Sequence, residues 1–167
     1  MDICITTGAG YGKSPLSAFD AALNDAGVHN FNLIYLSSII PAETSIKFKK
    51  FTASRRQYGD RLYVVRAEIR SRESGKYIGA ALGWYQLKNG RGVFVEHEEI
   101  GETESAVKSN LTTEVKRSLT DLCRSRGYPN TEKRMQIKMR ILKVTDSSAC
   151  ALVVAVYKSE KWGNDNI

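Results

Sequence analysis

The chain has 167 residues, of which 42% are hydrophobic, and this length fits one domain with a packed core. Its three cysteines are widely spaced and lack a CxxC pair, which indicates reduced thiols in a cytoplasmic protein. No apolar stretch approaches the length of a membrane span, and an acid at position 2 stands where a signal peptide would be basic. The sequence therefore argues against a membrane protein and against a secreted domain held by disulfides.

The net charge of +7 first suggests nucleic-acid binding, because lysine and arginine gain affinity by releasing counterions from phosphates. The basic residues are scattered along the chain, however, and no RNP-like, zinc-finger or helix-turn-helix pattern accompanies them. Solvated faces explain most of these charges. We therefore expect no nucleic-acid partner.

The first quarter of the chain has the pattern of a strand, a glycine loop, a helix and a second strand. Residues 2–6 alternate as a short strand, and the glycines within residues 8–12 indicate a loop. Ser14 is a typical N-cap for a helix that Gly27 ends, and a strand over residues 31–36 follows. The apolar stripe expected on this helix consists of Leu16, Phe19, Leu23 and Ala26.

The rest of the chain has mostly strand periodicity around one long helix. Strands are predicted at residues 45–48, 61–71, 75–87, 92–100, 136–144 and 149–157. The second and third of these are expected to pair across a tight turn, and Asn89-Gly90 is a strong hairpin signal. Thr103 begins a helix that ends at Gly127, with an apolar stripe of Val107, Leu111, Val115, Leu119 and Leu122. Two helices against six to eight strands indicate a single α+β domain.

Two familiar kinds of site are not supported by the sequence. Residues 8–14 look like a phosphate-binding loop, but the pattern G-x-x-x-x-G-K-[ST] requires glycine at position 7, where Thr7 stands. We interpret these glycines as turn residues or as backbone that passes close to a neighbour. His29 and His97 are the only histidines and lie far apart, so we expect no metal site.

The serine pair Ser37-Ser38 stands where the strand over residues 31–36 ends, and Pro41 follows. A serine pair in isolation usually caps or solvates a loop. A hydroxyl held against the preceding carbonyl can instead attack its own backbone and convert the Ser37–Ser38 amide to an ester. β-Elimination and hydrolysis would then leave a pyruvoyl group made from Ser38.

The residues around this pair closely resemble the pyruvoyl-dependent arginine decarboxylases. That family has an Ala-Phe-Asp-x-Ala-Leu helix, an Ala-Gly turn and an Asn-x-Asn-Leu strand before Ser-Ser and a nearby proline. The matching segments here are residues 18–23, 26–27, 30–33, 37–38 and Pro41. The resemblance returns at Gly92–His97 and more loosely in residues 111–122.

The resemblance implies a four-layer αββα sandwich in one domain, residues 1–167. It also implies self-cleavage into a β chain, residues 1–37, and an α chain, residues 38–167, with a covalent pyruvoyl group from Ser38 as the cofactor. The implied activity converts L-arginine to agmatine and CO₂ through a Schiff base on that group. Such an enzyme would act in polyamine biosynthesis as a homotrimer or a dimer of trimers.

The resemblance further assigns roles to individual side chains. Ser37 supplies the carbonyl that is attacked, and Ser38 supplies the attacking hydroxyl. Glu96 is the catalytic glutamate that returns a proton to the α-carbon, and Asn32 lines the active site. Asp20 holds the guanidinium of the substrate.

The residue pattern alone leaves these side-chain roles open. Asn32 has the same parity as Ser38 in an extended strand and should share its face, although it could equally bond to a neighbouring loop. Asp20 flanks the helical stripe, and periodicity alone favours a half-exposed surface acid. Glu96 lies opposite the apolar face of its strand, where a buried acid can serve as a general acid. His97 departs from the aromatic residue typical of relatives.

Two alternatives to arginine decarboxylation follow from the sequence. One is a pyruvoyl-dependent decarboxylase of ornithine, lysine or histidine, because the choice of substrate depends on a few residues around Asp20. The other is a non-catalytic basic module that binds nucleic acid or a protein partner.

Overall fold

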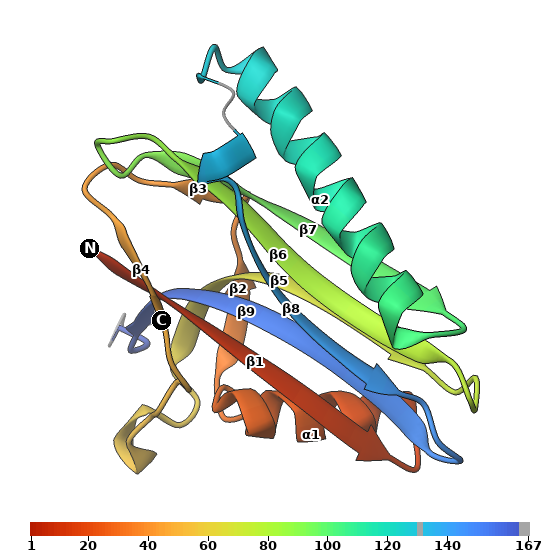
Figure 1. Cartoon of the computed structure of the whole chain (residues 1–167). Coiled ribbons are helices and arrows are strands. Elements are labelled where there is room, and N and C mark those ends of the chain that lie inside the picture. The colour runs from red at the N-terminus through yellow and green to blue at the C-terminus, as the bar shows by residue number, and fades with distance from the viewer. Residues whose placement is uncertain (130–131, 164–167) are drawn as a thin grey trace.

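The computed structural model describes residues 1–129 and 132–163, which form four layers in the order helix, sheet, sheet, helix (Figure 1). Helix α1 (Pro15–Ala26) covers the outer face of a five-stranded sheet. Helix α2 (Glu104–Ser125) covers the outer face of a four-stranded sheet. The expectation of an α+β, αββα sandwich is therefore confirmed.

The five-stranded sheet surrounds a central strand that is buried on both faces. Its order is β2 (Asn32–Tyr35), β5 (Arg61–Ser71), β9 (Ser148–Glu160), β1 (Asp2–Gly12) and β4 (Ser45–Phe48). The pairs β2–β5 and β1–β4 are parallel, and β9 is antiparallel to both of its neighbours. Burial on both faces explains why the sequence of β9 is almost continuously apolar from Ala149 to Val156.

The four-stranded sheet is antiparallel throughout. Its order is β3 (Ile39–Ile40), β7 (Gly92–Gly101), β6 (Tyr77–Gln86) and β8 (Gln136–Lys143). Two short 3₁₀ turns, Arg55–Gln57 and Glu132–Arg134, lie in the connections. The hairpin predicted at Asn89-Gly90 is confirmed: it joins β6 to β7, and Gly90 has the positive φ of 84° that such a turn requires.

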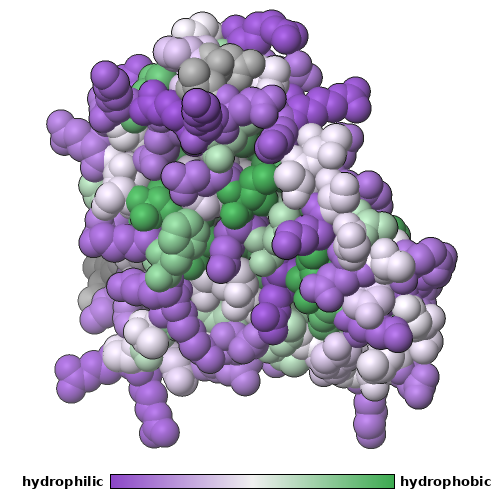
Figure 2. All heavy atoms as spheres, in the orientation of Figure 1, coloured by the Kyte–Doolittle hydropathy of each residue, from purple (hydrophilic) through white to green (hydrophobic). Residues whose placement is uncertain are grey.

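Three apolar cores fill the spaces between the four layers. The core between the sheets contains Ile3, Ile5, Val65, Ala67, Ile78, Leu82, Phe94 and Val153. The core under α1 contains Ala18, Ala22, Leu23, Ala26, Leu62, Val64, Leu152 and Val154. The core under α2 contains Tyr85, Val93, Val95, Val107, Leu111, Val115 and Leu119. Outside these cores, the face shown in Figure 2 is mostly polar, with hydrophobic residues in small separate groups.

The glycine segment is part of a strand, so the prediction of a loop at residues 8–12 was wrong. Strand β1 continues to Gly12, and its alternate glycines face α1. A Cβ on Gly8 would lie 2.0 Å from the carbonyl oxygen of Ala22, and one on Gly10 would lie 2.3 Å from that of Ala18. The second interpretation of these glycines, backbone that passes close to a neighbour, is confirmed.

This close approach also changes which face of α1 is buried. The buried residues are Ala18, Ala22, Leu23 and Ala26. The three alanines lie where the helix backbone packs directly on the glycines of β1, where only small side chains fit. Leu16, expected in the buried stripe, is 69% exposed. Both predicted ends are confirmed: Ser14 accepts a hydrogen bond from Ser17 N at 3.1 Å, and Gly27 has φ of 83°.

The long helix follows its predicted pattern closely. Thr103 caps α2 by accepting a hydrogen bond from Ala106 N at 3.2 Å, and Gly127 has the positive φ expected after the last turn. The first four residues of the predicted stripe are buried; Leu122 is half-buried, and Cys123 takes the innermost position beside it. None of the helices in the described part of the chain is long and apolar enough to cross a membrane.

The expected pairing of residues 61–71 with residues 75–87 was wrong. Strands β5 and β6 belong to different sheets and face each other across the central core. The backbone after β5 is tied to Val144, just beyond β8: Gly75 N donates to its carbonyl at 2.9 Å, and Val144 N donates to Lys76 O at 2.7 Å. These two hydrogen bonds direct the chain from the five-stranded sheet into the four-stranded sheet.

Candidate active site

The serine pair lies where the chain passes from one sheet to the other. Strand β2 ends at Tyr35 in the five-stranded sheet, and Leu36 N still donates to Val64 O of that sheet at 2.9 Å. Two residues later the Ser38 carbonyl accepts a hydrogen bond from Phe94 N of the four-stranded sheet at 2.8 Å. The Ser37–Ser38 peptide thus lies in the short segment that bridges the two layers.

Ser38 has a left-handed backbone conformation, with φ of 64°. Residues other than glycine rarely adopt this conformation, and it costs about 1–3 kcal/mol where the surroundings enforce it. Such strained residues cluster at functional sites. In this conformation the Ser38 hydroxyl donates a hydrogen bond to Glu96 Oε1.

Glu96 reaches this hydroxyl from the edge of the four-stranded sheet. Its neighbours Val93 and Val95 are buried against α2, whereas Phe94, on the same face as Glu96, packs in the core between the sheets. The predicted placement of Glu96 opposite the apolar face of β7 is confirmed. A carboxylate in this position can accept the proton of the Ser38 hydroxyl and can later give a proton back.

A cavity of about 400 Å³ opens beside this pair of residues. Strand and loop residues Ser37, Ser38 and Glu96 line one side. Ser118 and Asp121 of helix α2, and Arg126 just after its end, line the other side. The cavity thus combines a nucleophile, a carboxylate and further polar groups in one place.

Helix α2 contributes side chains that the sequence analysis did not select. His97 Nε2 and Ser118 Oγ are 2.9 Å apart, so this hydrogen bond fixes the strand against the helix at the cavity wall. Ser118 and Asp121 are three residues apart, beside the buried stripe of α2. Helical spacing next to Leu122 was the one signal in the sequence that could have placed them together.

The two neighbouring acids lie outside the cavity. Glu98 accepts a hydrogen bond from Glu68 N at 3.3 Å, and Glu99 accepts one from Asn110 Nδ2 at 3.3 Å. Glu96 is therefore the strand acid that contacts Ser38.

Among the described residues, Asn32 and Asp20 do not contact Ser38 or Glu96. Asn32 Nδ2 donates to Gly59 O at 2.6 Å, which matches the alternative of a structural bond to a loop. The inference that Asn32 shares a face with Ser38 fails, because β2 ends at Tyr35 and the left-handed Ser38 breaks the alternation. Asp20 is exposed on the outer face of α1. The roles of both residues stay predictions.

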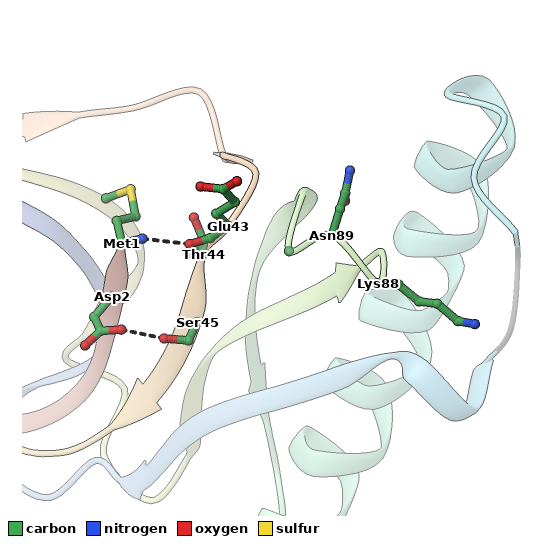
Figure 3. Close-up of a pocket in the computed structure, with 8 residues that line it drawn as sticks. Met1, Asp2, Glu43, Thr44, Ser45, Lys88 and Asn89 are labelled. Carbon is green, nitrogen blue, oxygen red and sulfur yellow. Dashed lines mark hydrogen bonds between the residues drawn. The ribbon is translucent and has the colours of Figure 1, made fainter.

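A second hollow, larger and more open, lies at the N-terminus (Figure 3). It has a volume of about 790 Å³ and is lined by Met1, Asp2 and the turns at Glu43 and Asn89. Its polar groups bond to one another: the Met1 ammonium donates to Glu43 O at 2.7 Å, and Ser45 donates to Asp2. The side chain of Lys88 points away from the rest. Neither Ser38 nor Glu96 is among the residues that line this hollow.

Comparison with known proteins shows one family over nearly the whole chain. The family model described as pyruvoyl-dependent arginine decarboxylase matches residues 2–161. A pyruvoyl-dependent arginine decarboxylase of Thermoplasma volcanium is 31% identical over 159 residues, which cover 92% of this chain and 87% of that protein. Those of Picrophilus torridus and Halobacterium salinarum are 30% and 29% identical, and the alignments cover 84% and 93% of this chain and 80% and 92% of those proteins.

The chain belongs to the pyruvoyl-dependent arginine decarboxylase family. The name of the family specifies a pyruvoyl group as its cofactor and arginine as its substrate. The surroundings of Ser38 fit such a group, because a small hydroxyl residue with strained backbone contacts a carboxylate beside a cavity.

Proposed function

We propose that this protein decarboxylates L-arginine to agmatine with a pyruvoyl group that it makes from Ser38. The observation that carries the proposal is the contact between the hydroxyl of the strained Ser38 and the Glu96 carboxylate, beside the cavity. The group arises by self-cleavage between Ser37 and Ser38. The products are a β chain of residues 1–37 and an α chain of residues 38–167.

The cleavage begins at the Ser38 hydroxyl. Its oxygen attacks the carbonyl carbon of Ser37 while Glu96 accepts the hydroxyl proton. The C–N bond breaks, the nitrogen takes up a proton, and Ser37 is left as an ester on Ser38 Oγ. Loss of the Ser38 α-proton then expels Ser37 as a carboxylate, and water replaces the nitrogen of the resulting dehydroalanine to give the ketone and ammonia.

During turnover the same side chains serve the substrate. A pyruvoyl carbonyl supplies the acceptor for the electrons that remain when the substrate carboxylate leaves as CO₂. Glu96, held next to residue 38, delivers a proton to the α-carbon. Asp20 pairs with the guanidinium, whose two parallel donors match the two carboxylate oxygens.

Because Asp20 and Asn32 lie away from the cavity within one protomer, the proposal requires a second copy of the chain to complete the site. A homotrimer, alone or as a dimer of trimers, with its sites between neighbours meets this requirement. Exposed apolar side chains support it: Leu16 lies one helical turn before Asp20, and Tyr35 and Ile39 flank the serine pair. These three side chains are 69%, 59% and 47% exposed.

The proposal extends to the place of the enzyme in the cell. Agmatine is a precursor for polyamine biosynthesis, and the three free, buried cysteines are consistent with a reducing cytoplasm. Measurement of agmatine and polyamines in cells that lack this enzyme tests this part.

Intact mass of the purified protein is the direct test of the function. The wild-type chain should split into fragments of residues 1–37 and 38–167, and the processed enzyme that contains both fragments should release CO₂ from arginine faster than from ornithine, lysine or histidine. A Ser38→Ala chain should stay whole and inactive. A wild-type chain that stays uncut yet decarboxylates arginine would refute the pyruvoyl mechanism.

A further inference from the structure

Tyr157 reaches from the five-stranded sheet to the residue that follows Ser38. It lies near the end of β9, and its hydroxyl donates a hydrogen bond to the carbonyl oxygen of Ile39 at 2.9 Å. Its ring packs edge-on against Phe94, with the ring centroids 6.4 Å apart. One side chain of the first sheet thus holds the start of β3, which belongs to the second sheet.

This hydrogen bond completes a set of ties on the C-terminal side of the scissile peptide. The Ser38 carbonyl is held by Phe94 N at 2.8 Å, and Ile39 pairs with Val93. Among the described residues, Tyr157 makes the only hydrogen bond from a side chain to the backbone of residues 38–40. A left-handed serine persists only where its surroundings fix the backbone on both sides.

We propose that Tyr157 is a positioning residue for the chemistry at Ser38. By fixing the Ile39 carbonyl, it holds Ser38 in the left-handed conformation that directs its hydroxyl to Glu96. This inference rests on the proposed function, because it assigns to Tyr157 the geometry of the self-cleavage step.

The surroundings of Tyr157 keep its hydroxyl in the donor form. Burial, and after it the negative charge of Glu96, raises the pKa of Tyr157 well above the ordinary tyrosine value. The hydroxyl therefore stays protonated and able to donate at neutral pH.

The hydrogen bond between Tyr157 and Ile39 would remain after the cleavage. Residues Ile39, Phe94 and Tyr157 all belong to the α chain, so the hydrogen bond continues to hold the new N-terminal residue 38 near Glu96 after residues 1–37 are released from the covalent chain. Loss of the Tyr157 hydroxyl should therefore affect cleavage and turnover in the same direction, through position rather than through substrate affinity.

The test compares two tyrosine variants that each lose one hydroxyl bonded to a backbone carbonyl. Tyr157→Phe removes the bond to Ile39. Tyr11→Phe is the matched control, because the Tyr11 hydroxyl donates to Lys143 O at 2.8 Å and Tyr11 pairs with Ala149, near the opposite end of β9. Intact mass follows cleavage over time in both variants and in the wild type, and melting temperature reports stability.

We expect Tyr157→Phe to slow cleavage by about 3- to 10-fold, the effect of one hydrogen bond, whereas Tyr11→Phe cleaves at the wild-type rate. Per pyruvoyl group, kcat of Tyr157→Phe should fall with KM unchanged. The melting temperatures of the two variants should be similar, which separates positioning from stability.

Two results would overturn the inference: cleavage of Tyr157→Phe at the wild-type rate, or equal slowing in both variants. Neither result would contradict the proposed function if the wild type splits and decarboxylates arginine. A wild type that does not split would instead refute the proposed function itself.

Discussion

Ser38 combines a hydroxyl with a backbone conformation that suits glycine better than serine. The two properties can be separated, because Ser38→Ala and Ser38→Gly both lack the hydroxyl and both should stay uncut. Glycine adopts φ of 64° freely, whereas alanine keeps the steric cost of a Cβ. We expect the glycine variant to be more stable than the alanine variant by about 1 kcal/mol. Urea unfolding of the two intact chains measures this difference, and equal stabilities would show that the backbone at residue 38 relaxes at no cost.

Glu96 is expected to act in the proton transfer after CO₂ leaves. Glutamine keeps the shape of the side chain and cannot deliver the proton, so Glu96→Gln should lower kcat by roughly 10²- to 10⁴-fold. Rates must be normalised to pyruvoyl content, because slower cleavage would lower activity as well. Glu99→Gln is the control, since Glu99 bonds to Asn110 and lies outside the cavity. A loss of only a few-fold would assign the proton transfer to another group.

Two carboxylates are candidates for binding the guanidinium of the substrate. Asp20 is the one that the family match selects, and Asp121 lines the cavity within the same protomer. Asp20→Asn should raise KM for arginine by roughly 10- to 100-fold while cleavage proceeds normally, because a charge-assisted hydrogen bond is lost. Asp121→Asn should leave KM nearly unchanged. The opposite pattern would place the guanidinium site on α2, without any need for a neighbouring protomer.

The candidate site was only partly predictable from the sequence, for reasons that differ by residue. Ser38 and Glu96 were found because the motif around each is specific, and the structure brings them together across 58 residues of chain. Asp121 and Arg126 were missed, since nothing in the spacing of α2 indicates that it faces the Ser38 segment. The parity argument for Asn32 failed because alternation holds only while the chain stays extended.

At the scale of elements, the contact between β1 and α1 depends on the absence of side chains. A methyl group at Gly10 would meet the backbone of α1, which cannot move aside as a flexible side chain could. We expect Gly10→Ala to destabilise the fold by about 1–3 kcal/mol, the usual cost of overpacking.

Thermal or urea unfolding of Gly10→Ala in a Ser38→Ala background tests this without interference from cleavage. The comparison is Gly59→Ala, where a Cβ meets nothing within 4 Å and only the positive φ of 88° is unfavourable. A smaller effect at Gly10 than at Gly59 would mean that α1 can shift away from the sheet.

The helices were predicted well because local sequence signals mark their ends. Ser14, Gly27 and Thr103 mark helix termini through hydrogen bonds that depend only on neighbouring residues. Strand partners do not have such local signals. Strand β5 pairs with β9 and not with β6, and the chain after β5 is directed away by hydrogen bonds to Val144, a residue far away in the sequence. The need for glycine in β1 likewise becomes clear only when α1 is packed on that strand.

At the scale of the whole molecule, the net charge of +7 is not concentrated at the Ser38 cavity. There Glu96 and Asp121 face the single guanidinium of Arg126. A different hollow, of about 390 Å³ between β1 and β8, carries the denser positive charge of Lys49, Lys50, Lys138 and Arg140. The site for a cationic substrate thus keeps its carboxylates on a basic protein, as charge complementarity requires.

Strand β1 lies inside the five-stranded sheet, and its contacts would hold the two fragments together after the proposed cleavage between Ser37 and Ser38. Residues 1–37 contain β1, which is paired with β9 on one side and β4 on the other, and α1, which is packed over both β1 and β9. If the chain is cut as proposed, the processed enzyme consists of two chains with one shared core, and its refolding becomes a reaction between two molecules. We expect its yield of refolded enzyme to fall more steeply on dilution than the yield of uncut Ser38→Ala, which has no second fragment to recapture. Near-ultraviolet circular dichroism after removal of denaturant measures both, and identical yields would mean that the α chain folds without its N-terminal partner. On this proposal the Ser37–Ser38 peptide bond is needed for the first folding of the chain and is absent in every later refolding.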